Sequence, residues 1–422
     1  MLIAFVREIF PSGMALRIVS FVFYLAGIAA IYFLGERLKG GFAGLWASIG
    51  LAFNPVYFGS GASVLTDVPL TFFCIIYIFL LAGLDPHRPL RYHLILATVG
   101  GLAVLLKWSG AVLIPVTLVA YGMRLSPMNW PSRAARALIP TGTMLFLLWL
   151  FMRIAVATSF SGFLGRIAAD VGDYQRVGIN ILSAFAIVGA PALRWLCVLG
   201  ILGLRNEKRY TAALLLSWLA TFIPGIAIFI PAGVARYYLP LLPCLVLIMG
   251  MAVEQAVSAG ESRWAQRFLR PAALGMALAG YLVSLTQFNA AVMKQENINL
   301  GYADAGAVIR KLANSDTVIL AASERQLRYF TGFNLQEFGG NIVPLRYEKQ
   351  ELEEFLRKTP GEVLIVLDCW EALQPSWVRL GGGETTNYLH SLGFELVDVV
   401  HGFLDPQHPE AGMRPWFWIY RN

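Results

Sequence analysis

Three charged residues and a tyrosine lie where apolar stretches of the chain end, and their types suit chemistry on a phosphate and a hydroxyl group. Asp67 occurs in the sequence LTDVPL, Lys107 in KWSG, and Arg236 with Tyr237 in ARYYLPLLP. A carboxylate can accept a proton from a hydroxyl group or bind a metal ion, and cations can hold a phosphate. Because charged side chains are costly at membrane depth, each of these residues needs an explanation. Together they would form one charged cavity.

Each of these residues also has a simpler structural interpretation. Pro69 follows Asp67 within one helical turn, and an acid at a helix start suits the helix dipole, so Asp67 can be an N-terminal cap. A lysine beside a tryptophan is typical of an anchor at the membrane interface, and an arginine beside tyrosines can extend to the lipid headgroups. The long segment 158–180 carries further polar residues, for which a solvated loop is the plainer interpretation: Asp170, Asp173, Tyr174 and Arg176.

The composition indicates that lipid solvates much of the chain. Its 422 residues are 57% hydrophobic and 14% charged, with a mean hydropathy of +0.62, whereas soluble domains carry about 25% charged residues. Residues 1–291 hold 21 Lys/Arg and 9 Asp/Glu, a net charge of +12, and residues 292–422 hold 12 and 17, a net charge of −5. Basic loops beside apolar spans are expected in membrane proteins, so the pI near 9.2 does not indicate nucleic-acid binding.

Ten apolar stretches approach the length of about 20 residues that crosses a membrane. They run over 14–34, 41–58, 64–84, 93–108, 109–125, 137–157, 179–203, 211–230, 237–256 and 271–291. Alternate loops carry 13 Lys/Arg and the opposite ends carry 7, so the more basic set is predicted to be cytoplasmic. Asp67, Lys107 and Arg236 are then predicted at the extracytoplasmic face, together with both termini.

Two details of this topology are unusual. With an external N-terminus, no apparent removable signal peptide and Met1 just before the first span, insertion is difficult. We therefore expect that at least one upstream helix is missing from these residues; the alternative is a genuine external N-terminus. Arg194 inside the seventh stretch indicates either an early helix end or a side chain that extends to the interface.

Residues 292–422 are predicted to form a second, water-soluble domain after the membrane domain of residues 1–291. Apolar or β-branched runs at 317–321, 362–367, 394–400 and 416–420 predict strands, and 304–312 and 350–358 predict helices. This alternation favours a small α/β domain on the extracytoplasmic side. The glycines at 381–383 follow no convincing strand and indicate a turn rather than a phosphate loop, and the four cysteines show no metal or disulfide spacing.

Five short segments, in order, resemble the lipid-linked-sugar glycosyltransferases of the GT-C architecture, particularly the protein O-mannosyltransferase and aminoarabinose (lipid A) transferase branch. They are Leu16-Arg17 before the first span, GERL at 35–38 after it, and the LTDVPL, KWSG and RYYLPLLP segments. The resemblance covers most of residues 14–256. It implies an α-helical polytopic membrane protein of about ten spans, and some relatives carry a small α/β domain after the last helix.

The resemblance also implies a function: transfer of a sugar from a polyprenyl-phosphate carrier to a protein, lipid or glycan acceptor at the outer face of a plasma or inner membrane. It assigns Asp67 as the catalytic residue, through the position of the family's second, supporting acid. It assigns Lys107, Arg236, Tyr237 and Arg17 to substrate binding. Some relatives bind a divalent metal ion, for which Asp67 is the candidate ligand.

One part of the family pattern has no counterpart here, namely the first helix and the first outer loop with its principal acidic motif. Either those residues precede this chain or another residue serves as base, and the residues given predict weak or no transferase activity. Two other classes stay open. A transporter or flippase predicts internal repeats and charges near the bilayer midplane, whereas these charges lie at one face; a non-catalytic membrane scaffold is compatible with the missing acidic loop.

Overall fold

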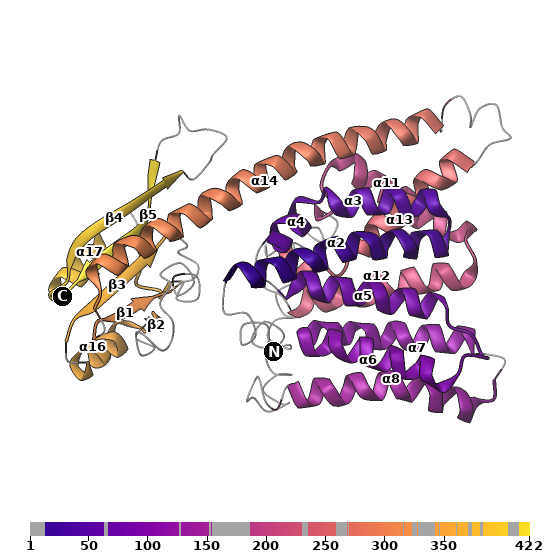
Figure 1. Cartoon of the computed structure of the whole chain (residues 1–422), viewed down its shortest axis with the longest axis horizontal. Helices are drawn as coiled ribbons and strands as arrows, with labels where there is room; N and C mark the ends of the chain where they lie inside the picture. Colours follow the sequence, from indigo (N-terminus) through magenta and orange to yellow (C-terminus); the bar gives the residue numbers. More distant parts are fainter. Residues whose placement is uncertain are drawn as a thin grey trace. The chain divides into compact units, whose positions relative to one another are not determined.

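The computed structural model describes residues 13–422 except 63–65, 126–127, 152, 154–185, 230–234, 259–267, 269, 315, 323–326, 328–341, 346, 360, 370–373, 380–382 and 404–412. The chain divides into two compact units, Met1–Asn289 and Ala290–Asn422. The first is helical and the second contains a five-stranded sheet (Figure 1).

Long apolar helices lie side by side in the helical unit (Figure 1). α2 packs against α3 and α5, α6 packs against α8, and α13 packs against α3 and α11. The elements are α2 (Gly13–Leu38), α3 (Gly41–Ala52), α4 (Pro55–Ala62), α5 (Asp67–Ala82), α6 (Leu90–Leu106), η1 (Trp108–Val112), α7 (Leu113–Arg124), α8 (Trp130–Phe151), α11 (Pro191–Gly203), η3 (Leu204–Asn206), α12 (Arg209–Phe229), η4 (Ala235–Tyr238), α13 (Leu242–Ser258) and the start of α14 (Arg270–Leu312).

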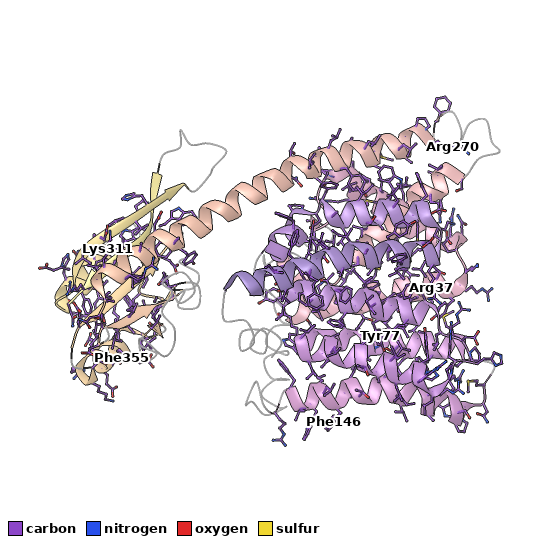
Figure 2. The ribbon with its side chains drawn as sticks, viewed as in Figure 1. Arg37, Tyr77, Phe146, Arg270, Lys311 and Phe355 are labelled. Atoms are coloured by element: carbon purple, nitrogen blue, oxygen red, sulfur yellow. The ribbon has the colours of Figure 1, made fainter. Side chains whose placement is uncertain are left out.

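The surface of this unit is suited to lipid. Residues 18–38 of α2 and the 22 residues of α8 are each long and apolar enough to cross a membrane, and four further apolar helices are 10–17 residues long. Large apolar side chains face outward: Phe33 of α2 is 55% exposed, and Phe146 of α8, labelled in Figure 2, is 58% exposed. Water contact at so many apolar side chains is unfavourable. The chain is therefore a membrane protein, and the number of about ten spans stays a prediction.

The stretch 41–58, predicted as one span, is interrupted. The Asn54 side chain accepts hydrogen bonds from the amides of Val56 (3.1 Å) and Tyr57 (3.0 Å), and its Nδ2 donates to the carbonyl of Ile187 (2.7 Å). An asparagine cap followed by a proline starts a new helix, which is why α4 begins one residue later. The stretch 41–58 therefore contains two helices, α3 and the start of α4.

The second unit is a mixed sheet with helices on both faces. The strand order is β2-β1-β3-β5-β4; β1 pairs in parallel with β2 and β3, and β5 pairs antiparallel with β3 and β4. Ile309 of α14 packs on one face, and Leu352 and Leu389 pack on the other. The elements are β1 (Val318–Ala321), β2 (Ile342–Pro344), α16 (Lys349–Lys358), β3 (Val363–Asp368), α17 (Glu384–Ser391), β4 (Glu395–Phe403) and β5 (Met413–Arg421).

All four strands predicted from the sequence are present, and so is the helix predicted over 350–358. β2 and α17 were not predicted. The helices predicted separately over 271–291 and 304–312 belong to one 43-residue helix, α14. Its intervening residues include Lys294, Gln295 and Glu296, which favour helix although they end the apolar pattern. The division between the two units therefore falls inside a helix.

Candidate functional site

Asp67 is the first residue of α5, and Thr66 is the N-cap. The hydroxyl of Thr71 donates to the main-chain oxygen of Asp67 at 2.7 Å, which fixes the first turn. The residue is 3% exposed. Its carboxylate accepts a hydrogen bond from Lys107, so the side chain makes a tertiary contact.

Lys107 lies at a break between two helices. It ends α6 with an extended backbone (φ −160°, ψ 134°), and η1 follows directly. The amide of Gly110 donates to the Lys107 carbonyl at 2.8 Å. A Cβ atom at Gly110 would lie 2.5 Å from the carbonyl carbon of Ala103, so glycine allows η1 to approach the last turn of α6. The break turns the Lys107 side chain inward, where it is 18% exposed.

The Lys107 ammonium connects the predicted residues. Its Nζ lies 2.6 Å from Oδ1 of Asp67 and 4.0 Å from the ring centre of Tyr237. The Cζ atom of Arg236 lies 5.5 Å from the same ring. Cations at such distances are attracted to the negative face of an aromatic ring. The structure therefore brings Asp67, Lys107, Tyr237 and Arg236 into one cluster, which we call the Asp67 cluster.

The short helix η4 positions the aromatic and the guanidinium parts of this cluster. Tyr238 is fully buried and anchors the segment, whereas Arg236 on the same turn is exposed. The amide of Leu239 donates to the Arg236 carbonyl at 3.2 Å and tightens the turn. One turn of the RYYLPLLP segment therefore holds both a buried anchor, Tyr238, and an exposed cation, Arg236.

One positioning residue was missed. The buried side chain of Asn54 starts α4 and ties it to the main chain at Ile187, and α4 contacts both α5 and η4, which carry the cluster. The signal that could have found it is the Asn-Pro pair inside an otherwise apolar stretch, because that pair is typical of a helix start.

The cluster combines one carboxylate with two cations, a net charge of +1. Asp67 and Lys107 neutralise each other, and their side chains are 5% and 18% exposed. The exposed Arg236 supplies the excess positive charge. A guanidinium and an ammonium near one ring form strong charge-assisted hydrogen bonds to an oxyanion such as phosphate.

The other residues predicted for the site are not among the described contacts of the Asp67 cluster. Arg17 belongs to α2, but its side chain is outside the described residues, as is the segment with Asp170, Asp173, Tyr174 and Arg176. Arg194 lies in the first turn of α11, which begins at Pro191, and its Nε donates to the Gly189 carbonyl at 2.9 Å. The described residues therefore place it at a helix start, not at the early helix end that was one of the two predictions.

A divalent metal does not fit the described part of the cluster. Asp67 is the one acid there, beside two cations, whereas magnesium and calcium take several oxygen ligands. Within the described ranges there is no group of three or more His, Cys, Asp or Glu side chains that could hold a metal ion.

Comparisons with known proteins bear on the fold of the chain. Residues 1–155 match the family model of dolichyl-phosphate-mannose-protein mannosyltransferase. The crystal structure of ArnT from Cupriavidus metallidurans matches with a TM-score of 0.55 in the apo state and 0.60 bound to undecaprenyl phosphate, at 13% identity over 99% of this chain and 86% of that chain. The chain has the GT-C fold.

A second solved structure is that of the GT-C oligosaccharyltransferase AglB from Archaeoglobus fulgidus, in complex with an inhibitory peptide and a dolichol-phosphate. It matches with a TM-score of 0.53 and 13% identity over 87% of this chain and 60% of that chain. A comparison with the sequences of curated proteins gives no match.

These findings confirm the predicted resemblance to GT-C glycosyltransferases. At 13% identity, the likeness to the two solved GT-C proteins establishes the arrangement of the chain, and the roles of single residues rest on the Asp67 cluster itself.

Proposed function

We propose that this GT-C protein is a membrane glycosyltransferase that moves a sugar from a polyprenyl-phosphate carrier to a hydroxyl group of a protein, lipid or glycan acceptor. The observation that carries the proposal is the contact of Lys107 with both Asp67 and Tyr237, beside Arg236. It unites a base, a phosphate-binding cation and an aromatic platform from three separate parts of the chain.

The solved relatives support the choice of donor. ArnT was crystallised with undecaprenyl phosphate and AglB with a dolichol-phosphate, both of which are polyprenyl phosphates. The AglB protein was also crystallised with an acceptor peptide, and with zinc and sulfate. The Asp67 cluster suits the phosphate group of such a donor, because the cluster holds two cations and one acid.

In the proposed mechanism, the acceptor hydroxyl oxygen attacks the anomeric carbon of the sugar. The bond between that carbon and the phosphate oxygen breaks, and the carrier leaves as a polyprenyl phosphate. Lys107 and Arg236 bind the phosphate, whose negative charge grows as the bond breaks. Asp67 accepts the proton of the attacking hydroxyl.

The ion pair gives this mechanism an order of events. Without donor, Asp67 and Lys107 neutralise each other at 2.6 Å. A bound phosphate competes with Asp67 for the Lys107 ammonium. The carboxylate then loses its closest partner and can accept a hydrogen bond from the acceptor hydroxyl, so donor binding precedes proton transfer.

The membrane arrangement completes the proposal. The Asp67 cluster lies at the extracytoplasmic ends of about ten spans, where the headgroup of a long lipid carrier meets water. Residues 292–422 form a water-soluble domain on the same side. Basic loops at the opposite helix ends, which the positive-inside rule makes cytoplasmic, support this orientation.

A transfer assay tests the proposal. The purified chain is incubated with radiolabelled polyprenyl-phosphate sugars and with acceptor extracts, and sugar in the acceptor fraction is measured. Asp67→Asn should lower the transfer rate by about 100-fold or more, because a positioned base contributes about 10²–10⁴-fold. Lys107→Gln should lower it similarly.

Two matched controls have the same change of charge at an exposed pair. Glu354 and Lys358 of α16 form an ion pair with side chains 63% and 72% exposed. Glu354→Gln and Lys358→Gln should transfer sugar at the wild-type rate. Because the residues given predict weak transfer, each variant is compared with the wild-type rate measured beside it. An Asp67→Asn rate equal to that of wild type, or failure of wild type to bind any polyprenyl-phosphate sugar, would contradict the proposal.

A further inference from the structure

A hollow of about 510 Å³ lies in the helical unit where α11, α13 and the first turns of α14 meet. Arg37 in the last turn of α2 and Arg270 at the start of α14 lie toward this same end of the unit (Figure 2). Known ligand pockets occupy about 300–1,000 Å³. The hollow is therefore large enough for a lipid headgroup with the first part of its acyl chains.

The hollow and the Asp67 cluster lie at opposite ends of the helices. The Arg37 guanidinium lies over the Phe79 ring at 4.8 Å, so the end of α2 meets the C-terminal part of α5. Asp67 is the first of the 16 residues of α5, which rise about 24 Å at 1.5 Å per residue. A ligand in the hollow cannot touch the Asp67 cluster.

The polar lining of the hollow includes an ion pair with an amide, formed by Lys39, Glu207 and Gln255, which we call its floor. Lys39 Nζ lies 2.6 Å from Oε1 of Glu207, and Gln255 Nε2 donates to the same oxygen at 2.6 Å. The Glu207 side chain is 7% exposed and that of Lys39 is 25% exposed. An ammonium donates up to three hydrogen bonds, and a carboxylate accepts several, so both ends of the pair can bind further groups.

The rest of the lining, which we call the walls of the hollow, is mostly apolar, with Asn206 and Ser258 as its polar members. Leu196 and Leu199 come from α11, Ala252 and Ala256 from α13, and Met276 from α14. Leu199 is 49% exposed, which opens this wall to the surroundings of the unit. A polar floor under apolar walls in a membrane protein matches an amphipathic molecule.

We propose that this hollow is a binding site for a phospholipid whose headgroup carries both a phosphate and a primary ammonium, as in phosphatidylethanolamine. The lipid phosphate binds Lys39, and the lipid ammonium donates hydrogen bonds to Glu207. The acyl chains lie along Leu199 and Met276. The site is independent of the proposed sugar transfer.

Charge complementarity selects this headgroup over the alternatives. The floor is a neutral pair, and a zwitterion matches each of its charges with an opposite one. An anionic headgroup such as phosphatidylglycerol leaves Glu207 beside a phosphate without a compensating cation. The trimethylated ammonium of phosphatidylcholine has no N–H group and cannot donate to Glu207.

Lipid titration of the full chain by native mass spectrometry tests the proposal. The purified, delipidated protein is titrated with phosphatidylethanolamine, phosphatidylcholine and phosphatidylglycerol of identical acyl chains. Wild type should bind phosphatidylethanolamine about tenfold more tightly than the other two. Glu207→Gln should weaken that binding about tenfold and abolish the preference, because one charge-assisted hydrogen bond is lost. Glu354→Gln, the exposed control, should leave it unchanged.

A second variant tests the walls without touching the ion pair. Ala256→Phe fills the hollow and should lower the affinity for all three lipids about tenfold, while polyprenyl phosphate, which binds at the other end, keeps its affinity. This variant decides the question if Glu207→Gln does not fold. Tighter binding of phosphatidylglycerol than of phosphatidylethanolamine by wild type, or unchanged lipid binding by Ala256→Phe, would overturn the proposal.

Discussion

Removing the Lys107 ammonium should leave the Asp67 carboxylate buried without its nearest partner. The carboxylate side chain is 5% exposed and the lysine side chain 18% exposed, so water replaces little of the lost interaction. Breaking a buried ion pair from one side costs about 3–5 kcal/mol. Because Lys107 has some access to water, we expect Lys107→Met to lower the free energy of unfolding by about 3 kcal/mol.

The double variant separates the ion pair from other effects. Asp67→Asn keeps a hydrogen-bond acceptor and should cost about 2 kcal/mol, whereas Asp67→Asn with Lys107→Met removes both charges and should cost about 2 kcal/mol in total. The interaction energy of the pair is then about 3 kcal/mol. Reversible unfolding in mixed detergent and SDS micelles, followed by tryptophan fluorescence, measures each variant.

The exposed pair Glu354–Lys358 provides the control cycle. Its side chains are 63% and 72% exposed and lie four residues apart on α16, so its interaction energy should be about 0.3–0.5 kcal/mol. An interaction energy for Asp67 and Lys107 no larger than that of the exposed pair would refute the contact between them, and with it the geometry of the site.

Three further substitutions test contacts that hold the helical unit together. Asn54→Ala removes a helix cap and leaves a buried carbonyl without its amide donor, so the free energy of unfolding should fall by about 2–4 kcal/mol in the same assay. Gly110→Ala would place a Cβ atom 2.5 Å from the carbonyl carbon of Ala103 in α6. The free energy of unfolding should fall by about 1–3 kcal/mol, and the affinity for polyprenyl phosphate should fall because Lys107 shifts. An unchanged affinity would show that the position of Lys107 does not depend on this close approach. Glu254 of α13 accepts a hydrogen bond from the amide of Ala43, in the first turn of α3, at 2.8 Å. Glu254→Ala should therefore reduce the free energy of unfolding by about 1 kcal/mol and lower the unfolding midpoint; an unchanged midpoint would contradict a stabilising role for this contact.

The small domain could be predicted well because its strands carry local signals. The runs at 317–321 and 362–367 are apolar and β-branched, and they became β1 and β3 with nearly the predicted bounds. β2 was missed because it has three residues and takes its structure from pairing with β1. Such a strand depends on its neighbour more than on its own composition.

Single residues at the helix ends were predictable, but their contacts were not. The topology indicated that Asp67, Lys107 and Arg236 share one face of the bundle, which limited where they can meet. It did not indicate that the Lys107 ammonium lies between the carboxylate and the Tyr237 ring, because that depends on the break at η1. Breaks of this kind depend on close approaches such as that at Gly110, which hydropathy does not report.

Whether the Asp67 cluster binds phosphate is measured by comparing the affinity for a polyprenyl phosphate with that for the same polyprenol without phosphate. We expect the phosphate to increase the affinity of wild type by about 100-fold, equal to about 2.7 kcal/mol, and Lys107→Gln and Arg236→Gln each to remove most of this gain. Lys358→Gln should keep the gain. Equal affinity of wild type for the alcohol and the phosphate, or a full gain in both cluster variants, would show that Lys107 and Arg236 do not bind the phosphate.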